Sequence, residues 1–413
     1  MNDFAAAVRR LVSERGMSQN QLAEQSHWDA GYLSKVLNGR KQGTHALAAD
    51  LDRVLDAGGE LLGVWTAEHG SPALKALADP SHSNGTPEAA SGMLSRWDAV
   101  HEPPGAPVLT AGQVGAAEIS HLEDIARMFR SWDHERGGGL GRKTAAGQLA
   151  DVSELIGQPH PVLLRRRLLS VASMLALTIA SMAADGGDTA DAYRYLGAAL
   201  EAAREARDAA LGARAANAIA RRMLDDGDAD DALGLLRHAR ACLRDLPGEM
   251  TALLVTSEAW TCAALGDYNQ MAPSLDRAAE TVGAPGSLFG PAELAGITGA
   301  CFEALAMRPG KRRAAYTASA ERHIIEALRL RESFYARSRA LDLAGLANVR
   351  LCQDEPVEAV RVAADALEAA AGLRSGRAAR RVHSLAIRAL GEYPGVAEVT
   401  EFADMVRSRL PVT

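Results

Sequence analysis

The stretch Ser18–Arg40, SQNQLAEQSHWDAGYLSKVLNGR, contains the start and stop signals of two short helices. Ser18, followed three residues later by Gln21, has the pattern of a capping box, in which each side chain bonds the other residue's backbone amide. Asp29 is a residue type that caps a second helix, and Asn38-Gly39 ends it because both types accept a left-handed backbone. The pattern predicts two helices joined by a tight turn, over residues 18–26 and 29–37.

The flanking sequence supplies three more amphipathic segments. Apolar residues recur at helical spacing before the quoted stretch, where Gly16 ends the run, and again after it, where Thr44 is a cap type. The residues expected to face inward are Phe4, Val8, Leu11 and Val12, then Leu47, Leu51, Val54 and Leu55, then Leu61, Leu62, Val64 and Trp65. The sequence therefore predicts five short helices around one small apolar centre.

The spacing from Met17 to Gly39 resembles the helix-turn-helix of phage repressor and Cro proteins, the XRE family, over residues 3–68. The resemblance implies a lambda-repressor-like domain whose third helix enters the major groove of double-stranded DNA. Ala30 and Gly31 offer little to base edges, so specificity is expected to depend on DNA shape, dimer spacing or a partner. The DNA contacts that the resemblance implies are Gln19, Ala30, Gly31, Ser34, Lys35, Asn38, Arg40 and Lys41.

Charge and composition set limits on the partners. The whole chain of 413 residues carries a net charge of −7, so it is not a general binder of polyanions. Residues 30–44, however, contain three Lys or Arg and no acid, which leaves one face able to meet phosphates. Ala, Leu and Arg dominate the chain and aromatic residues make up only 4%, which favours an all-α protein of two or more domains.

Three regions are expected along the chain. A helix-turn-helix domain over residues 1–69 precedes a proline-interrupted segment over 70–112, which predicts a flexible linker. Residues 93–100, around Trp97, are compatible with a brief docked helical turn, but an unpacked linker is favoured. A helical repeat domain is expected over 113–413.

The repeat domain shows self-similarity at a nearly fixed period. Small and apolar residues recur in sets whose starts differ by 40, 39, 49 and 39 residues, and Gly-Asp precedes the first three sets as a turn and cap. The sets are Ala192, Leu196, Ala199; Ala232, Leu236, Ala239; Met271, Leu275, Ala278; Ala320, Ile324, Ala327; and Ala359, Ala363, Ala366. The pattern predicts an α-solenoid of helical hairpins.

The array resembles tetratricopeptide (TPR) repeats, most closely at Ala264–Tyr268, ALGDY. With the segment Phe129–Gly139, FRSWDHERGGG, the whole layout resembles a group of actinobacterial regulators and the peptide-responsive regulators of Gram-positive bacteria. The resemblance implies a ligand groove lined by the first helix of each pair. The expected groove residues are Arg214, Asn217, Arg221, Trp260 and Asn348; each is equally compatible with an ordinary solvated, paired or core position.

Neither catalysis nor a cofactor is expected. The eleven histidines show no ligand or triad spacing, and Cys242, Cys262, Cys301 and Cys352 are too far apart for a metal-site motif. No signal peptide is found, and the apolar run Met174–Ala184 is too short to cross a bilayer, so a cytoplasmic protein without membrane contact is expected.

The expected function is therefore a sequence-specific transcriptional regulator rather than an enzyme. A homodimer would bind an inverted-repeat operator, and the repeat domain would dimerise, sense a peptide, a small molecule or a small protein, or do both. Two alternatives stay open: a DNA-tethered scaffold whose repeats dock a small protein partner, and a DNA-binding protein that maintains a plasmid or phage.

Overall fold

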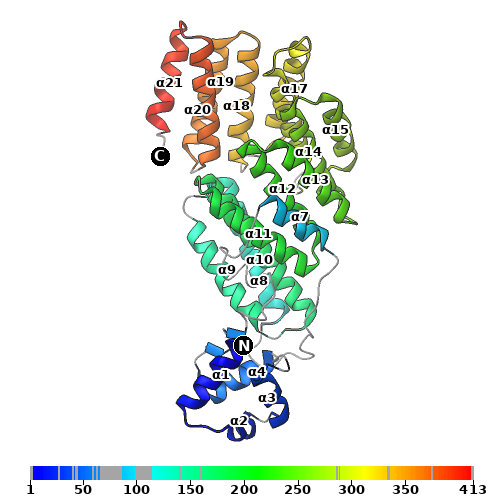
Figure 1. Ribbon diagram of the computed structural model, residues 1–413. Helices are drawn as coiled ribbons and strands as arrows, with labels where there is room; N and C mark the ends of the chain where they lie inside the picture. Colours follow the sequence, from blue (N-terminus) through cyan, green and yellow to red (C-terminus); the bar gives the residue numbers. More distant parts are fainter. Residues whose placement is uncertain are drawn as a thin grey trace. The chain divides into compact units, whose positions relative to one another are not determined.

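The computed structural model describes residues 3–26, 28–39, 41, 45–57, 60–61, 64–65, 86–97, 114–138, 141–158, 160–284, 287, 289–332, 335–373 and 375–410. They belong to two compact units, Met1–Lys75 and Ala76–Thr413, which we call the head unit and the array unit. All regular secondary structure in the described ranges is helical (Figure 1), so the predicted all-α class is confirmed.

The head unit contains α1 (Asp3–Glu14), α2 (Gln19–Ser26), α3 (Ala30–Leu37) and α4 (His45–Val54), with further helical residues at 60–61 and 64–65. The capping box forms as predicted: the Gln21 amide donates to Ser18 Oγ at 3.3 Å, and the Ser18 amide donates to Gln21 Oε1 at 2.8 Å. Gly39 ends the motif with a φ of +70°. The core residues include Phe4, Val8, Leu11, Leu22, Leu33, Leu47, Leu51, Leu55 and Leu61. Thr44 and Leu62 lie outside the described residues.

Replacing Asp29 by alanine is expected to weaken α3 by about 1 kcal/mol, because Asp29 Oδ1 accepts the Tyr32 amide at 2.7 Å as the N-cap. Asp29→Asn keeps an equally good cap and serves as the control. Hydrogen exchange of the α3 amides in the full chain measures the change. Equal protection in the two variants would contradict this assignment of the cap.

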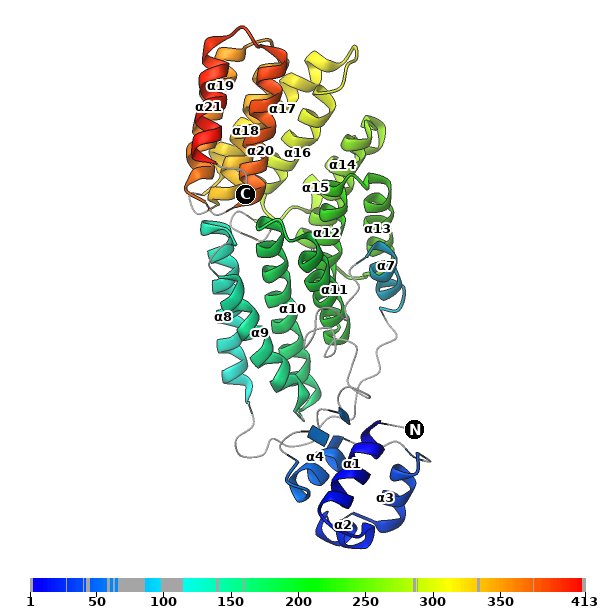
Figure 2. The ribbon, with the colours of Figure 1, turned by 60° about the vertical axis from the view of Figure 1, so that its left-hand side comes forward.

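The array unit is built from helical pairs that follow one another along the chain (Figures 1 and 2). Its helices are α7 (Pro87–Ser95), α8 (Ala116–Arg136), α9 (Arg142–Gly157), α10 (Val162–Asp185), α11 (Thr189–Ala206), α12 (Ala209–Asp226), α13 (Ala229–Cys242), α14 (Gly248–Leu265), α15 (Tyr268–Thr281), α16 (Pro291–Ala306), α17 (Arg313–Leu330), α18 (Ala336–Cys352), α19 (Pro356–Ala371), α20 (Gly376–Glu392) and α21 (Ala397–Arg409).

The recurring sequence sets mark the second helix of five pairs, α10/α11 to α18/α19. Every residue of the five sets is buried, at 9% exposure or less. The predicted Gly-Asp turns also form: Gly187, Gly227 and Gly266 have φ values of +80°, +99° and +84°, and the following aspartates are N-caps. Small side chains at these positions let the paired helices approach closely, which is why the period could be read from sequence.

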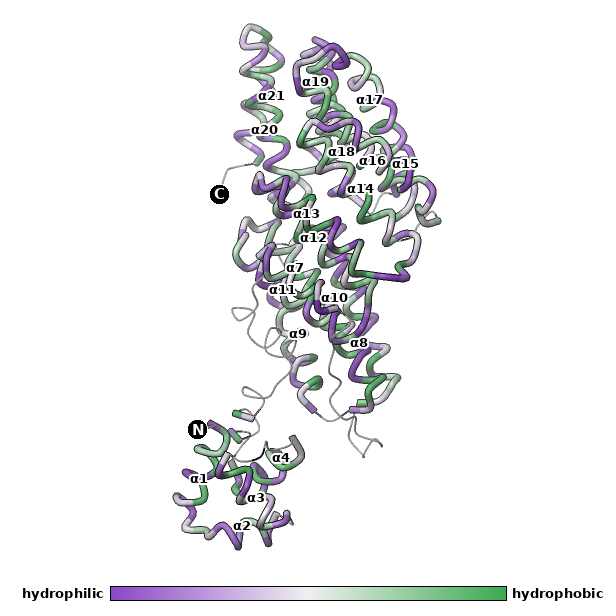
Figure 3. The backbone as a smooth tube through the Cα atoms, turned by 45° about the vertical axis from the view of Figure 1, so that its right-hand side comes forward, coloured by the Kyte–Doolittle hydropathy of each residue, from purple (hydrophilic) through white to green (hydrophobic). Residues whose placement is uncertain are grey.

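Helix α10 is the one described helix whose length and composition would allow it to cross a bilayer, and 83% of its most apolar 18-residue window is buried. It packs against α8, α9 and α11 and forms part of the core of the array unit. Elsewhere, hydrophobic and hydrophilic residues alternate along the helices, as in α20 and α21 (Figure 3). In α20 the inward positions are Val382, Leu385, Ala386 and Ala389.

Part of the expected linker differs from the prediction, because α7 is a helix that packs on α11, α12 and α13. Leu94 is fully buried and Trp97 is 8% exposed. Trp97 lies against Gly212 of α12: a Cβ built on Gly212 would meet its ring at 2.2 Å. On α13, His238 Nε2 lies 2.9 Å from the Ser95 hydroxyl oxygen. The favoured unpacked state is therefore wrong for residues 86–97, where a buried tryptophan outweighs the proline-rich surroundings.

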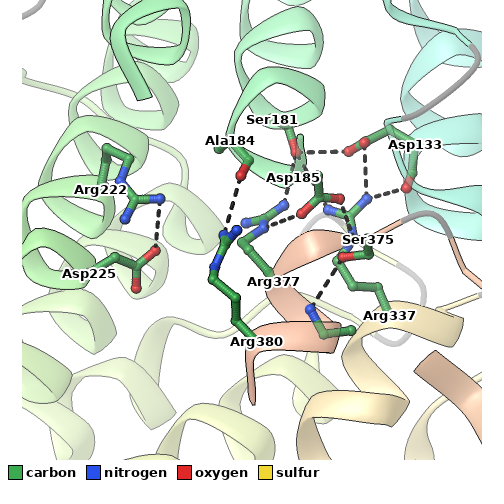
Figure 4. Close-up of polar contacts among 11 residues, drawn as sticks. Asp133, Ser181, Ala184, Asp185, Arg222, Asp225, Arg337, Ser375, Arg377 and Arg380 are labelled. Carbon is green, nitrogen blue, oxygen red and sulfur yellow. Dashed lines mark hydrogen bonds and ion pairs between the residues drawn. The ribbon is translucent and has the colours of Figure 1, made fainter. Parts of the chain in front are cut away.

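The beginning and end of the array also meet, because α18 packs against α8 and α20 against α10. A buried polar network joins them (Figure 4). Arg337 of α18 lies 3.0 Å from Asp133 of α8 and 3.3 Å from Asp185 of α10, while Arg377 of α20 lies 2.6 Å from Asp185. Simple repeat arrays contact only their neighbours, so this closure is an addition to the predicted solenoid.

Candidate nucleic-acid interface and ligand site

Helix α3 presents one side to the head core and the other outward. Leu33, Val36 and Leu37 are buried, which follows from their helical spacing. The predicted base-contacting residues fall on the opposite side: Ala30, Gly31 and Lys35 are exposed, and Ser34 is half-buried. The outward side of α3 therefore carries small side chains near the start of the helix and a cationic side chain near its end.

The surroundings of α3 hold it in place. Trp28 donates from Nε1 to Asp50 of α4 at 3.0 Å, and its ring stacks on Tyr32 with centroids 5.5 Å apart. Lys41 Nζ lies 4.8 Å from the Tyr32 ring centre, so a second cation is positioned beside α3. This chain of contacts joins α4, α3 and the residue that follows the motif.

The other residues predicted to contact DNA differ in exposure and in the hydrogen bonds that they already form within the protein. Gln19 is exposed in the first turn of α2, where helix amides favour anions. The Asn38 side chain is exposed but donates from Nδ2 to the Ser34 carbonyl oxygen at 2.9 Å. Arg40 lies outside the described residues.

Residues 3–65 match the family model of a helix-turn-helix domain. A search of curated proteins found no match, and a search of solved structures found none either. The matched residues are those that form the capped helices of the head unit, so this unit is a helix-turn-helix domain of the DNA-binding type.

In the array unit, four of the five predicted groove residues come together. Arg214, Asn217 and Arg221 share one side of α12, since they are three and four residues apart. The Arg221 guanidinium lies 3.8 Å from the ring centre of Trp260 on α14. These residues lie on the first helices of their pairs, α12/α13 and α14/α15.

Asn348 lies elsewhere, in a polar cluster between α16, α18 and α20. Its Nδ2 donates to Glu303 Oε1 at 2.9 Å, and its Oδ1 accepts from Arg388 Nη1 at 3.2 Å. Both ends of this amide are already bonded within the protein. The structure thus joins Asn348 to its neighbouring helices and not to the residues of α12.

Two residues of α8 that sequence reasoning left unassigned, Arg130 and His134, lie near enough to Arg214 for charge to act between them. Burial, with a smaller contribution from the Arg130 charge, lowers the pKa of Arg214 to about 10. Burial, followed by the charges of Arg130 and Arg337, lowers the pKa of His134 to about 3. Both residues belong to the FRSWDHERGGG segment, whose charge pattern was the available signal.

Proposed function

We propose that this protein is a sequence-specific, DNA-binding transcriptional regulator of the cytoplasm. The observation that carries the proposal is the outward side of α3, in a domain that matches a helix-turn-helix family. Its N-cap Asp29 and the stacking of Trp28 on Tyr32 hold this helix in place. Such domains place their second motif helix in the major groove, and a homodimer reads two half-sites about one helical turn apart.

Few residues of α3 can read bases directly. Lys35 suits the O6 and N7 acceptors of guanine, Ala30 offers one methyl group, and Gly31 offers no side chain. Gln19, with the first amides of α2, and Lys41 suit phosphates. Specificity would then depend on DNA shape and on the spacing of two heads.

The array unit supplies the regulatory part of the proposal. TPR-like hairpin arrays bind partners along the first helices of their pairs, and α12 and α14 place charged and aromatic groups there. We propose that the array senses a ligand and contributes to dimerisation. Bound ligand would change the spacing of the two heads and so the affinity for the operator.

Lys35→Ala is expected to weaken operator binding about tenfold and to relax the preference for guanine at one position. The slope of log affinity against log salt should change little, because the phosphate contacts are assigned to Gln19 and Lys41. Genomic footprinting of the full chain would identify the operator, and gel shifts over a range of salt concentrations would give both quantities.

The matched control is Arg53→Ala. Arg53 lies on α4 with 76% of its side chain exposed, and it pairs with Asp50 on an acidic part of the head. Its loss should leave DNA binding unchanged. Equal effects of the two substitutions, or no binding to genomic fragments at low salt, would overturn the proposal.

A further inference from the structure

Several buried or half-buried arginines of the array unit are matched by acids. Arg337 pairs with Asp133 and Asp185, and Arg240 pairs with Glu258 at 2.8 Å. Arg331 contacts Asp342 at 2.7 Å and Glu293 at 3.1 Å. Pairing of this kind is expected, because a buried charge without a counter-charge is costly.

Three arginines depart from this rule. Arg130, Arg214 and Arg221 are only partly exposed, and none forms an ion pair with an acid in the described part of the chain. Acids act on them only at longer range. Asp208 and Glu249 raise the pKa of Arg214, Glu249 and Asp133 raise that of Arg130, and Asp225 raises that of Arg221, but none lies within ion-pair distance of these guanidinium groups. Among the residues that the structure describes, the Trp260 ring is the close partner of the Arg221 guanidinium.

The charges also repel one another. Burial lowers the pKa of Arg214 and of Arg221 to about 10, and the neighbouring charges of Arg130 and Arg377, respectively, act in the same direction. His134 stays neutral beside them, as its pKa of about 3 indicates. Arg214 and Arg221 nevertheless remain protonated at neutral pH, because each pKa stays near 10. Two positive charges on α12 therefore lack an acid within ion-pair distance in the described part of the chain.

Asn217 provides a second and independent observation. It lies on α12 between Arg214 and Arg221 and is 8% exposed, and its Oδ1 accepts no hydrogen bond from any residue that the structure describes. Buried acceptors are almost always satisfied, and a missing donor costs about 1–3 kcal/mol. A ligand that brings an N–H or O–H to this atom would remove that cost.

We propose that Arg130, Arg214, Asn217 and Arg221 form a binding site for an elongated ligand with two anionic groups. Arg221 follows Arg214 by seven positions on α12, which sets a spacing of about 10 Å along the helix. The anionic groups of the ligand are carboxylates or phosphates, which guanidinium groups bind well. Between them the ligand carries an N–H or O–H group that donates to Asn217 Oδ1. This inference names the chemistry of the ligand and rests on the proposed sensing role of the array unit.

The test uses the full chain and three probes. The peptide Glu-Gly-Glu carries N–H donors between its carboxylates, as the proposal requires, whereas octanedioate and hexane-1,6-bisphosphate supply the two anions without a central donor and should bind more weakly than a ligand that also reaches Asn217. Acetate and inorganic phosphate are the single-anion comparisons. At least one two-anion probe is expected to bind by calorimetry, and the preferred probe distinguishes a carboxylate ligand from a phosphate ligand. Arg214→Gln and Arg221→Gln should each weaken binding about tenfold or more. Arg361→Gln is the control, because Arg361 is 67% exposed on α19.

The unliganded variants give a second readout. Without a probe, Arg214→Met should have the same midpoint of thermal unfolding as the parent protein or a higher one, because the substitution removes a charge that has no acidic partner. A fall of several degrees would show that Arg214 has a structural role and would overturn the proposal. Absence of binding by all three probes, or equal binding in every variant, would also overturn it.

The same variants separate this inference from the proposed function. Without any probe, Arg214→Gln should bind DNA like the parent protein, whereas Lys35→Ala should not. If the parent binds no DNA but binds a two-anion probe through Arg214, the regulatory proposal fails and the ligand site stands. If DNA binds and no probe does, only the ligand site fails.

Discussion

Arg337→Met is expected to lower the free energy of unfolding of the array unit by about 3–5 kcal/mol. Arg337 is 6% exposed and pairs with two buried acids, Asp133 and Asp185, which are 3% exposed each. It also donates to the Asp133 carbonyl oxygen. Removing the guanidinium leaves Asp133 without a cation and Asp185 with Arg377 alone.

The loss should be greatest where α8 and α10 meet α18 and α20. Hydrogen exchange is expected to rise in the second half of α8, which Asp133 anchors, and to stay unchanged in α15, which lies apart from the network. Urea unfolding of the full chain, followed by circular dichroism, measures the loss of stability, since the array supplies most of the helices.

Arg361→Met is the matched control for this substitution. Arg361 pairs with Glu358 on the surface of α19, where solvent screens the interaction, so no measurable change is expected. If Arg337→Met and Arg361→Met unfold at the same urea concentration, the network of Figure 4 does not hold the ends of the array together.

Local sequence signals predicted the local structure well. The caps at Ser18 and Asp29 involve residues only three apart, so the sequence contains all the atoms that form them. The hairpin period was equally readable, because Ala, Leu and Gly-Asp recur where helices press together. The repeat class, TPR or another, stays a prediction.

Long-range contacts could not be predicted. Arg337 and Asp133 are 204 residues apart, and no periodic pattern indicates that the two ends of the array meet. The α7 contact is similar, because the space for Trp97 depends on a glycine far along the chain. The repeat period placed Asn348 on the first helix of its pair. It could not indicate that Glu303 and Arg388 form hydrogen bonds with the Asn348 side-chain amide.

The candidate ligand site combines local features that the sequence predicts with long-range contacts that it does not. The spacing of Arg214, Asn217 and Arg221 follows from one helix, and their placement on one side of α12 was therefore predictable. Their lack of acidic partners was not, since it depends on which side chains α8 and α14 bring near them. Arg130 entered the site only through the packing of α8 in the array unit.

Gly212→Ala is expected to release α7 from the array. The added Cβ would lie 2.2 Å from Cη2 and 2.7 Å from Cζ3 of Trp97, so the indole ring must leave its position. Loss of a buried tryptophan contact costs about 3–5 kcal/mol. We expect this loss to exceed the free energy that holds the short helix α7 on the array. Leu94 and Ala90, both fully buried, would then become exposed. Hydrogen exchange and limited proteolysis of α7 in the full chain measure the release.

The design separates this contact from effects on α12 itself. Alanine is the better helix former by about 0.8–1.0 kcal/mol, so any loss must come from the clash. Gly234→Ala is the control: Gly234 lies within α13 with no atom near its added Cβ, and α7 should stay docked. In a Trp97→Ala background α7 is already released, so Gly212→Ala should no longer destabilise the chain. A double-mutant cycle would then give a large coupling energy between the two positions. Additive effects of the two substitutions would show that Trp97 does not occupy the space above Gly212.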